Sequence, residues 1–289
     1  MTEAVHAADG RIFAQLMHGG RQGHPLSRLA ADVPAGPSSV PVPGPVHVRD
    51  GGKADPVMPR VMTPEDIRQA VLDHVSAARN AIAAGFDGVE LHGANSYLIH
   101  QFLADNTNLR DDEYGQCTIE DRIRFPVEIV TAVAHAIGAE RTGLRLSPGN
   151  PQFGMEEANP GPVYRALVDT LDGLGLVYLH LTDNDRYPAP TDLRARWHGA
   201  LIANVGENSE PTTREDGEAV LMTGRADLVS YGRAFIANPD LPQRFERNSA
   251  LNTIDSENLY THGGDTDYPY LDSRTASLAL GDPASAEAV

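Results

Sequence analysis

Cysteine, lysine and long apolar runs are scarce in this chain of 289 residues, and each absence excludes a class of protein. The single cysteine, Cys117, excludes an intrachain disulfide, a Cys-x-x-Cys site and a four-cysteine iron–sulfur cluster. The single lysine, Lys53, lies in a Pro/Gly-rich stretch rather than at a strand end, which argues against a Schiff-base aldolase. No apolar run approaches the ~20 residues of a membrane-spanning helix.

Positive charge is also in short supply. The chain has 23 Lys+Arg against 40 Asp+Glu, a net charge of −17. Because phosphate groups are bound by clustered Lys and Arg, we expect neither nucleic acid nor an anionic membrane as a partner. The N-terminus, MTEAVHAADG, has neither the basic start nor the apolar stretch of a signal peptide, and we therefore expect a cytoplasmic protein.

Short β-rich runs alternate with helical periodicity along most of the chain. Strands are predicted at 12–16, 86–91, 142–146, 176–181, 201–204 and 227–230. Helices are predicted at 63–84, 118–137, 163–174, 213–223 and 241–247, the first with a buried stripe of Ile67, Val71, Val75, Ala78 and Ile82. This alternation favours an α/β fold with a parallel sheet, either doubly wound or a β/α barrel, and both place their chemistry at the carboxyl ends of the strands.

Two stretches differ in composition from this pattern. Residues 25–62 are rich in Pro, Gly and Ser, which predicts a hairpin or lid insertion after the first strand. Residues 273–289 are small and polar, which is typical of a disordered tail. We therefore predict one folded domain over residues 1–272.

The densest group of polar side chains at a predicted strand end is His92, Asn95 and Tyr97. A neutral imidazole and a carboxamide can each donate one N–H to the same oxygen, which polarises a carbonyl or nitro group. A nearby phenol can supply a proton to carbon. The alternative is that His92 and Asn95 only cap the turn after the strand, and their spacing does not decide between the two.

Three further positions indicate a bound anion or heterocycle. Arg145 lies inside the apolar strand GLRLSP, so it needs an anion or an acidic partner, the latter being a structural salt bridge. The pair Gly232-Arg233 either binds phosphate or lies on the surface. The amide of Gln15 can bond a planar heterocycle or another core polar group. The histidines show no metal-ligand spacing, and we predict no metal site.

Together these residues resemble the old yellow enzyme family of flavin-dependent ene-reductases. The resemblance is carried, over residues 1–272, by GRIFAQLMHGGRQGHP, AARNAIAAGFDGVELHGANSYLIHQFLADNTNLRDDEYG, GLRLSP, ADLVSYGRAFIANPDLPQRF and TDYPYLD. It implies a TIM (β/α)8-type barrel that holds FMN. It also implies that NAD(P)H reduces the flavin, which then passes a hydride to the β-carbon of a small-molecule activated alkene.

The resemblance implies a role for each of ten residues. The activating oxygen of the substrate would be bound by His92 and Asn95, and the α-carbon would be protonated by Tyr97. The FMN would be held by Gln15, Arg145, Gly206, Gly232 and Arg233. The substrate pocket would be lined by Met17 and Tyr270.

Departures from the family pattern carry expectations of their own. Family members have a further N-terminal segment with the first two barrel strands, so we expect about six of eight strands here. The unpaired edges would then favour a homo-oligomer. The alternative to an ene-reductase is a truncated, non-catalytic barrel fragment that fails to retain FMN. Ser96 stands where the family has glycine, which predicts a strained turn, and His100 replaces a common acidic residue.

Overall fold

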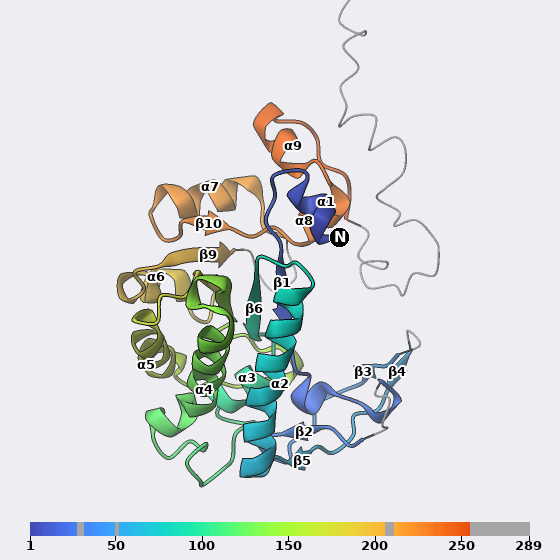
Figure 1. Cartoon of the computed structure of the whole chain (residues 1–289), viewed down its shortest axis with the longest axis vertical. Helices are drawn as coiled ribbons and strands as arrows, with labels where there is room; N and C mark the ends of the chain where they lie inside the picture. The colour runs from blue at the N-terminus through green and yellow to red at the C-terminus, as the bar shows by residue number, and fades with distance from the viewer. Residues whose placement is uncertain (28–31, 50–51, 206–210, 255–289) are drawn as a thin grey trace, which may run out of the picture.

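A six-stranded parallel sheet forms the centre of the computed structural model, which describes residues 1–27, 32–49, 52–205 and 211–254 (Figure 1). Gly206, Tyr270 and the predicted tail at 273–289 lie outside the described residues. The strands, in spatial order, are β1 (Phe13–Leu16), β6 (Gly88–Gly93), β7 (Thr142–Leu146), β8 (Tyr178–Thr182), β9 (Ala200–Asn204) and β10 (Leu228–Val229). All six predicted strands are confirmed, each boundary within two residues.

The strand order decides between the two predicted architectures. Spatial order follows chain order without reversal, whereas a doubly wound sheet reverses direction at a switch point. The sheet is therefore of the β/α-barrel type. Within the described residues, β1 pairs only with β6 and β10 only with β9, so these two strands are its edges.

Helices connect the strands. The longer ones are α2 (Pro64–Ala83), α4 (Ile119–Ile137), α5 (Pro160–Asp172) and α7 (Arg214–Met222). The shorter ones are α1 (Thr2–His6), α3 (Leu98–Leu103), α6 (Ala189–Leu193), α8 (Arg233–Ala237) and α9 (Leu241–Arg247), with 3-10 turns at Gly20–Gln22, Pro25–Ser27, Ala139–Arg141, Gln152–Gly154 and Arg194–Arg196. The sequence did not predict α1, α3, α6 and α8, because five or six residues are too few to show a 3.6-residue period.

The start of α2 shows why the long helices were predictable. The Thr63 hydroxyl accepts a hydrogen bond from the Asp66 N–H at 3.1 Å, and the Asp66 carboxylate accepts one from the Thr63 N–H at 2.8 Å. Pro64 occupies the first turn, where its missing N–H has no cost. This reciprocal cap lies entirely within four consecutive residues, so the sequence alone reveals it.

The buried face of α2 is rotated from the predicted one. The fully buried positions are Ile67, Ala70, His74, Ala78 and Ala81. Of the other predicted positions, Val71 and Val75 are half-buried and pack against the core, and Ile82 is half-buried. The small alanines face inward because α2 packs against both α4 and β6. His74 tolerates burial because its Nδ1 lies 2.7 Å from the Ala70 carbonyl oxygen within the helix.

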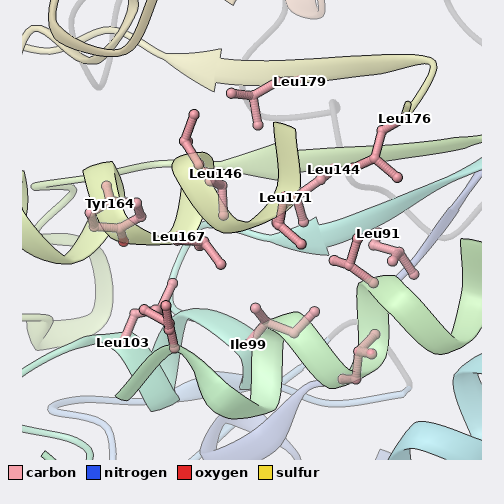
Figure 2. Close-up of a cluster of buried hydrophobic side chains, with 14 of the residues drawn as sticks. Leu91, Ile99, Leu103, Leu144, Leu146, Tyr164, Leu167, Leu171, Leu176 and Leu179 are labelled. Carbon is pink, nitrogen blue, oxygen red and sulfur yellow. The ribbon is translucent and has the colours of Figure 1, made fainter. Parts of the chain in front are cut away.

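The outer face of the sheet holds the apolar core (Figure 2). Leu91, Leu144 and Leu179 alternate along their strands with polar residues and are 1 % exposed or less. They pack beneath α4 and α5, with Leu167 and Leu171 of α5 in the same cluster. Since side chains alternate along a strand, the polar residues next to each leucine in its strand face the opposite, inner side of the sheet.

The described parts of the segment 25–62, residues 32–49 and 52–62, extend away from the sheet (Figure 1). Its strands β3 (Val46–His47) and β4 (Lys53–Ala54) pair antiparallel, which confirms the predicted hairpin. Nearer the body, β2 (Ala35–Gly36) pairs in parallel with β5 (Arg60–Val61). No helix in the described residues combines the length and apolar composition that a membrane crossing requires.

Candidate active site

The inner face of the sheet carries polar side chains near the carboxyl ends of the strands. In the strand register, His92 of β6 is paired with Arg145 of β7, which is paired in turn with His180 of β8. Side chains of paired residues in parallel strands point to the same side. The three groups therefore lie side by side near the carboxyl ends of the strands, where barrel enzymes bind their ligands.

His92 belongs to the strand itself, because β6 continues to Gly93 and the predicted end at Leu91 came two residues too early. Its side chain is 3 % exposed, and its Nδ1 has no hydrogen-bond partner among the described residues. Burial, and next the positive charge of Arg145, lower the pKa of His92 to about 4. The imidazole is therefore neutral near pH 7, with one N–H available to a ligand oxygen.

A tight turn with two left-handed residues joins β6 to α3. Asn95 has a φ of 52° and Ser96 a φ of 61°, a conformation that costs a non-glycine residue about 1–2 kcal/mol. The strain predicted at Ser96 is therefore present. Side chains of α3 offset it, because His100 Nδ1 accepts a hydrogen bond from the Ser96 N–H at 3.0 Å and Gln101 Nε2 donates one to the Ser96 carbonyl at 2.6 Å.

The turn brings Tyr97 against His92. Tyr97 precedes α3 as its N-cap residue and is half-buried. The centroids of the two rings lie 5.2 Å apart with an interplanar angle of 53°. The phenol and the neutral imidazole are therefore neighbours in the fold.

Asn95 is held by the loop that follows β7. Its backbone N–H donates to Ser147 Oγ at 2.8 Å. Its side-chain Oδ1 accepts a hydrogen bond from Asn150 Nδ2 at 3.2 Å. The β6–α3 turn and the β7 loop therefore meet at Asn95, and both its backbone and its side chain are oriented by this contact.

A second polar network lies beside this group on the inner face. Gln15 Nε2 donates to Glu90 Oε1 at 2.6 Å, His180 Nδ1 lies 2.8 Å from Glu90 Oε2, and His180 Nε2 lies 2.9 Å from Ser230 Oγ. Burial would raise the pKa of Glu90, but hydrogen bonds from His180 and Gln15 and the charge of Arg145 outweigh it and lower the pKa to about 2. Burial lowers the pKa of His180, so a neutral His180 donates from Nδ1 to the Glu90 carboxylate and accepts from Ser230.

Two contacts on the inner face join strands that are not neighbours in the sheet. Glu90 and His180 lie on strands separated by β7, and Arg145 Nη2 donates at 3.3 Å to Asn204 Oδ1 across β8. In a flat sheet such strands lie about 9–10 Å apart. Long side chains can bridge this gap, and a sheet that curls toward its inner face, as in the wall of a barrel, shortens it.

The described residues that were predicted to hold FMN lie on β1, on β7 and just beyond β10. Gln15 is exposed on the edge strand β1, and Arg145 lies on β7. Gly232 caps α8 just beyond β10, where a Cβ atom would meet no other atom within 4 Å, and Arg233 opens that helix. The predicted pocket residue Met17, just past β1, is 53 % exposed.

Four residues that support this site were not predicted from the sequence. Glu90 and His180 are polar residues inside apolar strands, the signal that had singled out Arg145, and the same reasoning would have found them. Asn150 and Ser230 carry no local signal. Their partners lie 55 and 50 residues away, so only the folded chain reveals them.

Comparisons with known proteins agree with this geometry. The sequence profile of the NADH:flavin oxidoreductase / NADH oxidase family matches residues 1–252. The chain is similar to 12-oxophytodienoate reductase 2 of Arabidopsis thaliana, with 37% identity over 286 residues that cover 94% of this chain and 75% of the relative.

Solved structures give the same result. The old yellow enzyme homologue of Zymomonas mobilis superposes with a TM-score of 0.86 at 36% identity, covering 93% of this chain and 76% of that one. Morphinone reductase in complex with tetrahydroNAD superposes with a TM-score of 0.85 at 42% identity, covering 94% and 76%. The chain thus spans about three quarters of the length of each, and the sheet described above is similar to part of their barrels.

Proposed function

Because the chain belongs to the NADH:flavin oxidoreductase / NADH oxidase family, we propose that it reduces the activated C=C bond of α,β-unsaturated carbonyl or nitro compounds. FMN is the cofactor of this family and NAD(P)H is its reductant. The observation that carries the proposal is the cluster of His92, Asn95 and Tyr97. It offers two N–H donors and one phenol on a single surface beside Arg145.

The donors of the inner face fit FMN. The exposed amide of Gln15 can both donate to and accept from the flavin pyrimidine edge, and the guanidinium of Arg145 suits its electron-rich oxygens. The open backbone at Gly232 and the adjacent Arg233 suit a phosphate. When bound, FMN accepts a hydride from NAD(P)H and delivers a hydride to the substrate.

His92 and Asn95 would bind the oxygen that activates the alkene. Reduction at the β-carbon moves negative charge onto this oxygen, and N–H donors aimed at it stabilise that charge. The lowered pKa of His92 keeps the imidazole neutral, so it donates one N–H without adding a buried positive charge beside Arg145. One such donor contributes about 3 kcal/mol to the transition state.

Tyr97 would supply the proton. Its phenol lies against the His92 ring, next to the oxygen-binding donors, so it can reach the α-carbon while the oxygen is held. A positioned acid of this kind contributes about 10²–10⁴-fold to a proton transfer. The products are the saturated compound and the tyrosinate, which regains its proton from water.

Retention of FMN is the first test. The purified chain is mixed with FMN, passed through a gel-filtration column, and its visible spectrum is recorded. We expect a retained flavin band near ~450 nm, since the inner face offers donors for ring and phosphate alike. A colourless protein would overturn the proposal and favour the alternative, a non-catalytic barrel fragment.

Alkene reduction is the second test, followed as NADPH oxidation in the presence of 2-cyclohexenone. His92→Ala is expected to lower kcat/KM about 10²–10³-fold. Tyr97→Phe is expected to slow reoxidation of the reduced enzyme about 10²-fold or more, with reduction by NADPH unchanged. Tyr114→Phe is the matched control, because the Tyr114 hydroxyl contacts only Glu128 among the described residues.

The outcome against the alkene assignment is also defined. A chain that retains FMN and is reduced by NADPH, yet is reoxidised by neither 2-cyclohexenone nor a nitro-alkene, would remain a flavin oxidoreductase but not an ene-reductase.

A further inference from the structure

A carboxamide has two ends of nearly the same shape, and only its partners decide which end is oxygen. For Asn95 the distinction is chemical. Its NH2 end stabilises a negatively charged substrate oxygen, whereas its carbonyl end repels it. Which residue imposes the orientation of this amide is therefore a question about the reaction as well as about the fold.

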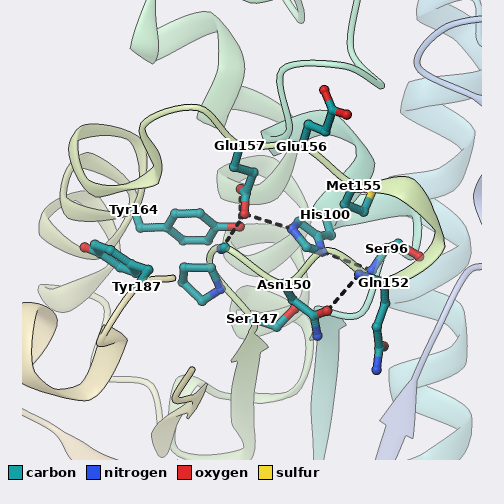
Figure 3. Close-up of polar contacts among 12 residues, drawn as sticks. Ser96, His100, Ser147, Asn150, Gln152, Met155, Glu156, Glu157, Tyr164 and Tyr187 are labelled. Carbon is teal, nitrogen blue, oxygen red and sulfur yellow. Dashed lines mark hydrogen bonds and ion pairs between the residues drawn. The ribbon is translucent and has the colours of Figure 1, made fainter. Parts of the chain in front are cut away.

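The orientation of the Asn150 amide is fixed by a backbone N–H, which can only donate a hydrogen bond. The N–H of Gln152 donates to Asn150 Oδ1 at 2.9 Å (Figure 3). The other end of the Asn150 amide is therefore its NH2 group, and this donates to Asn95 Oδ1 at 3.2 Å. The NH2 end of Asn95 is consequently the end left for a ligand, and within the described residues it donates to no protein acceptor.

The loop that carries Asn150 is held by hydrogen bonds on both sides. Asn150 is 3 % exposed, and its backbone N–H donates to the Ser147 carbonyl at 3.2 Å. The neighbouring Gly149 N–H donates at 2.6 Å to Glu157 Oε2, whose other oxygen accepts the Tyr164 hydroxyl at 2.8 Å (Figure 3). The loop that carries Asn150 is thus bonded to the strand end before it and to the helix after it.

We propose that Asn150 is a positioning residue of the reaction, which transmits the donor polarity of the Gln152 N–H to Asn95 and so presents the Asn95 NH2 group to the activating oxygen. This rests on the proposed function, because it presupposes that Asn95 binds that oxygen. Asn150 itself touches Asn95 and the loop backbone.

Asn150→Asp tests the relay, because it keeps the shape of the side chain and reverses one end. The introduced carboxylate still accepts from the Gln152 N–H, but its second oxygen faces Asn95 Oδ1. The Asn95 amide then turns over to donate to the carboxylate, and its carbonyl faces the substrate. We expect kcat/KM for 2-cyclohexenone to fall about 10²-fold, as for loss of one oxyanion donor.

Two readouts separate this effect from a structural one. As the pH is lowered and the introduced carboxyl group is protonated, it becomes a donor again, so kcat/KM of Asn150→Asp should recover relative to the parent enzyme. In the Asn95→Ala background the same substitution should cause no further loss, because Asn150 acts only through Asn95. Binding of 2-cyclohexenone to the oxidised holoenzyme, followed by flavin absorbance, should weaken in parallel.

Asn106→Asp is the matched control. Asn106 lies in the loop between α3 and α4, but its amide contacts the loop that carries Asn150 in a similar way: its Oδ1 accepts from the Glu156 N–H at 3.0 Å, and its Nδ2 donates at 2.7 Å to the Gly154 carbonyl. Asn106 has no contact with Asn95, so kcat/KM of Asn106→Asp should stay within about twofold of the parent value. Asn150→Ala imposes neither orientation on the Asn95 amide, so its kcat/KM should lie between those of the parent enzyme and Asn150→Asp. If Asn150→Asp does not fold, Asn150→Ala is used in its place.

Each result has a defined meaning. Two outcomes would overturn this inference and leave the proposed function standing. One is a loss of kcat/KM below about twofold for Asn150→Asp. The other is that the losses for Asn150→Asp and Asn95→Ala multiply in the double variant. An unchanged kcat/KM for Asn95→Ala would instead remove the proposed role of Asn95, and the inference with it.

Discussion

The imidazole of His180 lies 2.8 Å, from Nδ1 to Oε2, from the carboxylate of Glu90, although β7 separates the strands that carry them. The contact bridges these two strands on the inner face of the sheet. The carboxylate of Glu90 is buried there, and the positive charge of Arg145 lowers both its pKa and that of His92.

Replacing Glu90 by glutamine should destabilise the fold. The carboxylate accepts hydrogen bonds from both Gln15 and His180, and a carboxamide can accept with only one end. We expect the free energy of unfolding at pH 7 to fall by about 2–3 kcal/mol, measured by urea denaturation. Glu246→Gln removes the same charge from the exposed face of α9 and should change it by less than about 0.5 kcal/mol.

The pH dependence of this effect has a definite sign. The pKa of Glu90 is lowered to about 2 in the folded chain, so its charge stabilises the fold above pH 4.5 and this stabilisation is lost as the pH falls toward 2. The difference between Glu90→Gln and the parent chain should therefore shrink below pH 4.5. A difference that grows in this range would contradict the arrangement.

Burial of a neutral His92 predicts a second pH effect. Its pKa is about 4 in the folded chain against about 6.5 when unfolded, so the unfolded chain binds the proton first as the pH falls. Stability should therefore drop by about 2 kcal/mol between pH 7 and pH 5 on account of this residue. His92→Asn should lose that part of the pH dependence, whereas His47→Asn, at an exposed position of the hairpin, should keep it.

The cap of α2 predicts a modest, local effect. Asp66→Ala removes the acceptor of the Thr63 N–H and the ion pair with Arg60, whose Nη1 lies 2.6 Å from Asp66 Oδ2. We expect a loss of about 1 kcal/mol in the free energy of unfolding. Asp73→Ala removes the same charge from the same helix. Among the described residues, Asp73 accepts a hydrogen bond from Gln69 alone, so its loss should cost about half as much or less.

The left-handed turn at Ser96 predicts an inversion of the usual order of alanine and glycine. Both Ser96→Ala and Ser96→Gly lose the contact of Ser96 Oγ with Gln22, but only glycine adopts a φ of 61° without strain. The glycine variant should be more stable than the alanine variant by about 1 kcal/mol. At Ser76, inside α2, the order should be reversed by about the same amount. The same order at both sites, measured by thermal melting, would contradict a strained turn.

The sequence by itself determined the elements of this protein and their order. Strand alternation, the cap at Thr63, and polar residues at strand ends are signals that lie within about twenty consecutive residues. They were sufficient to predict six strands, the helix α2 and the group of His92, Asn95 and Tyr97. The resemblance of its motifs to a known family added the barrel and the cofactor.

The tertiary structure decided what supports those elements. It rotated the buried face of α2 because two neighbours pack against it, and it extended β6 to include His92 because β7 pairs with it there. It also joined Glu90 to His180 and Asn95 to Asn150, residues 90 and 55 positions apart. Such contacts depend on strand register and on the curvature of the sheet, which arise only when distant segments pack, so no local pattern in the sequence records them.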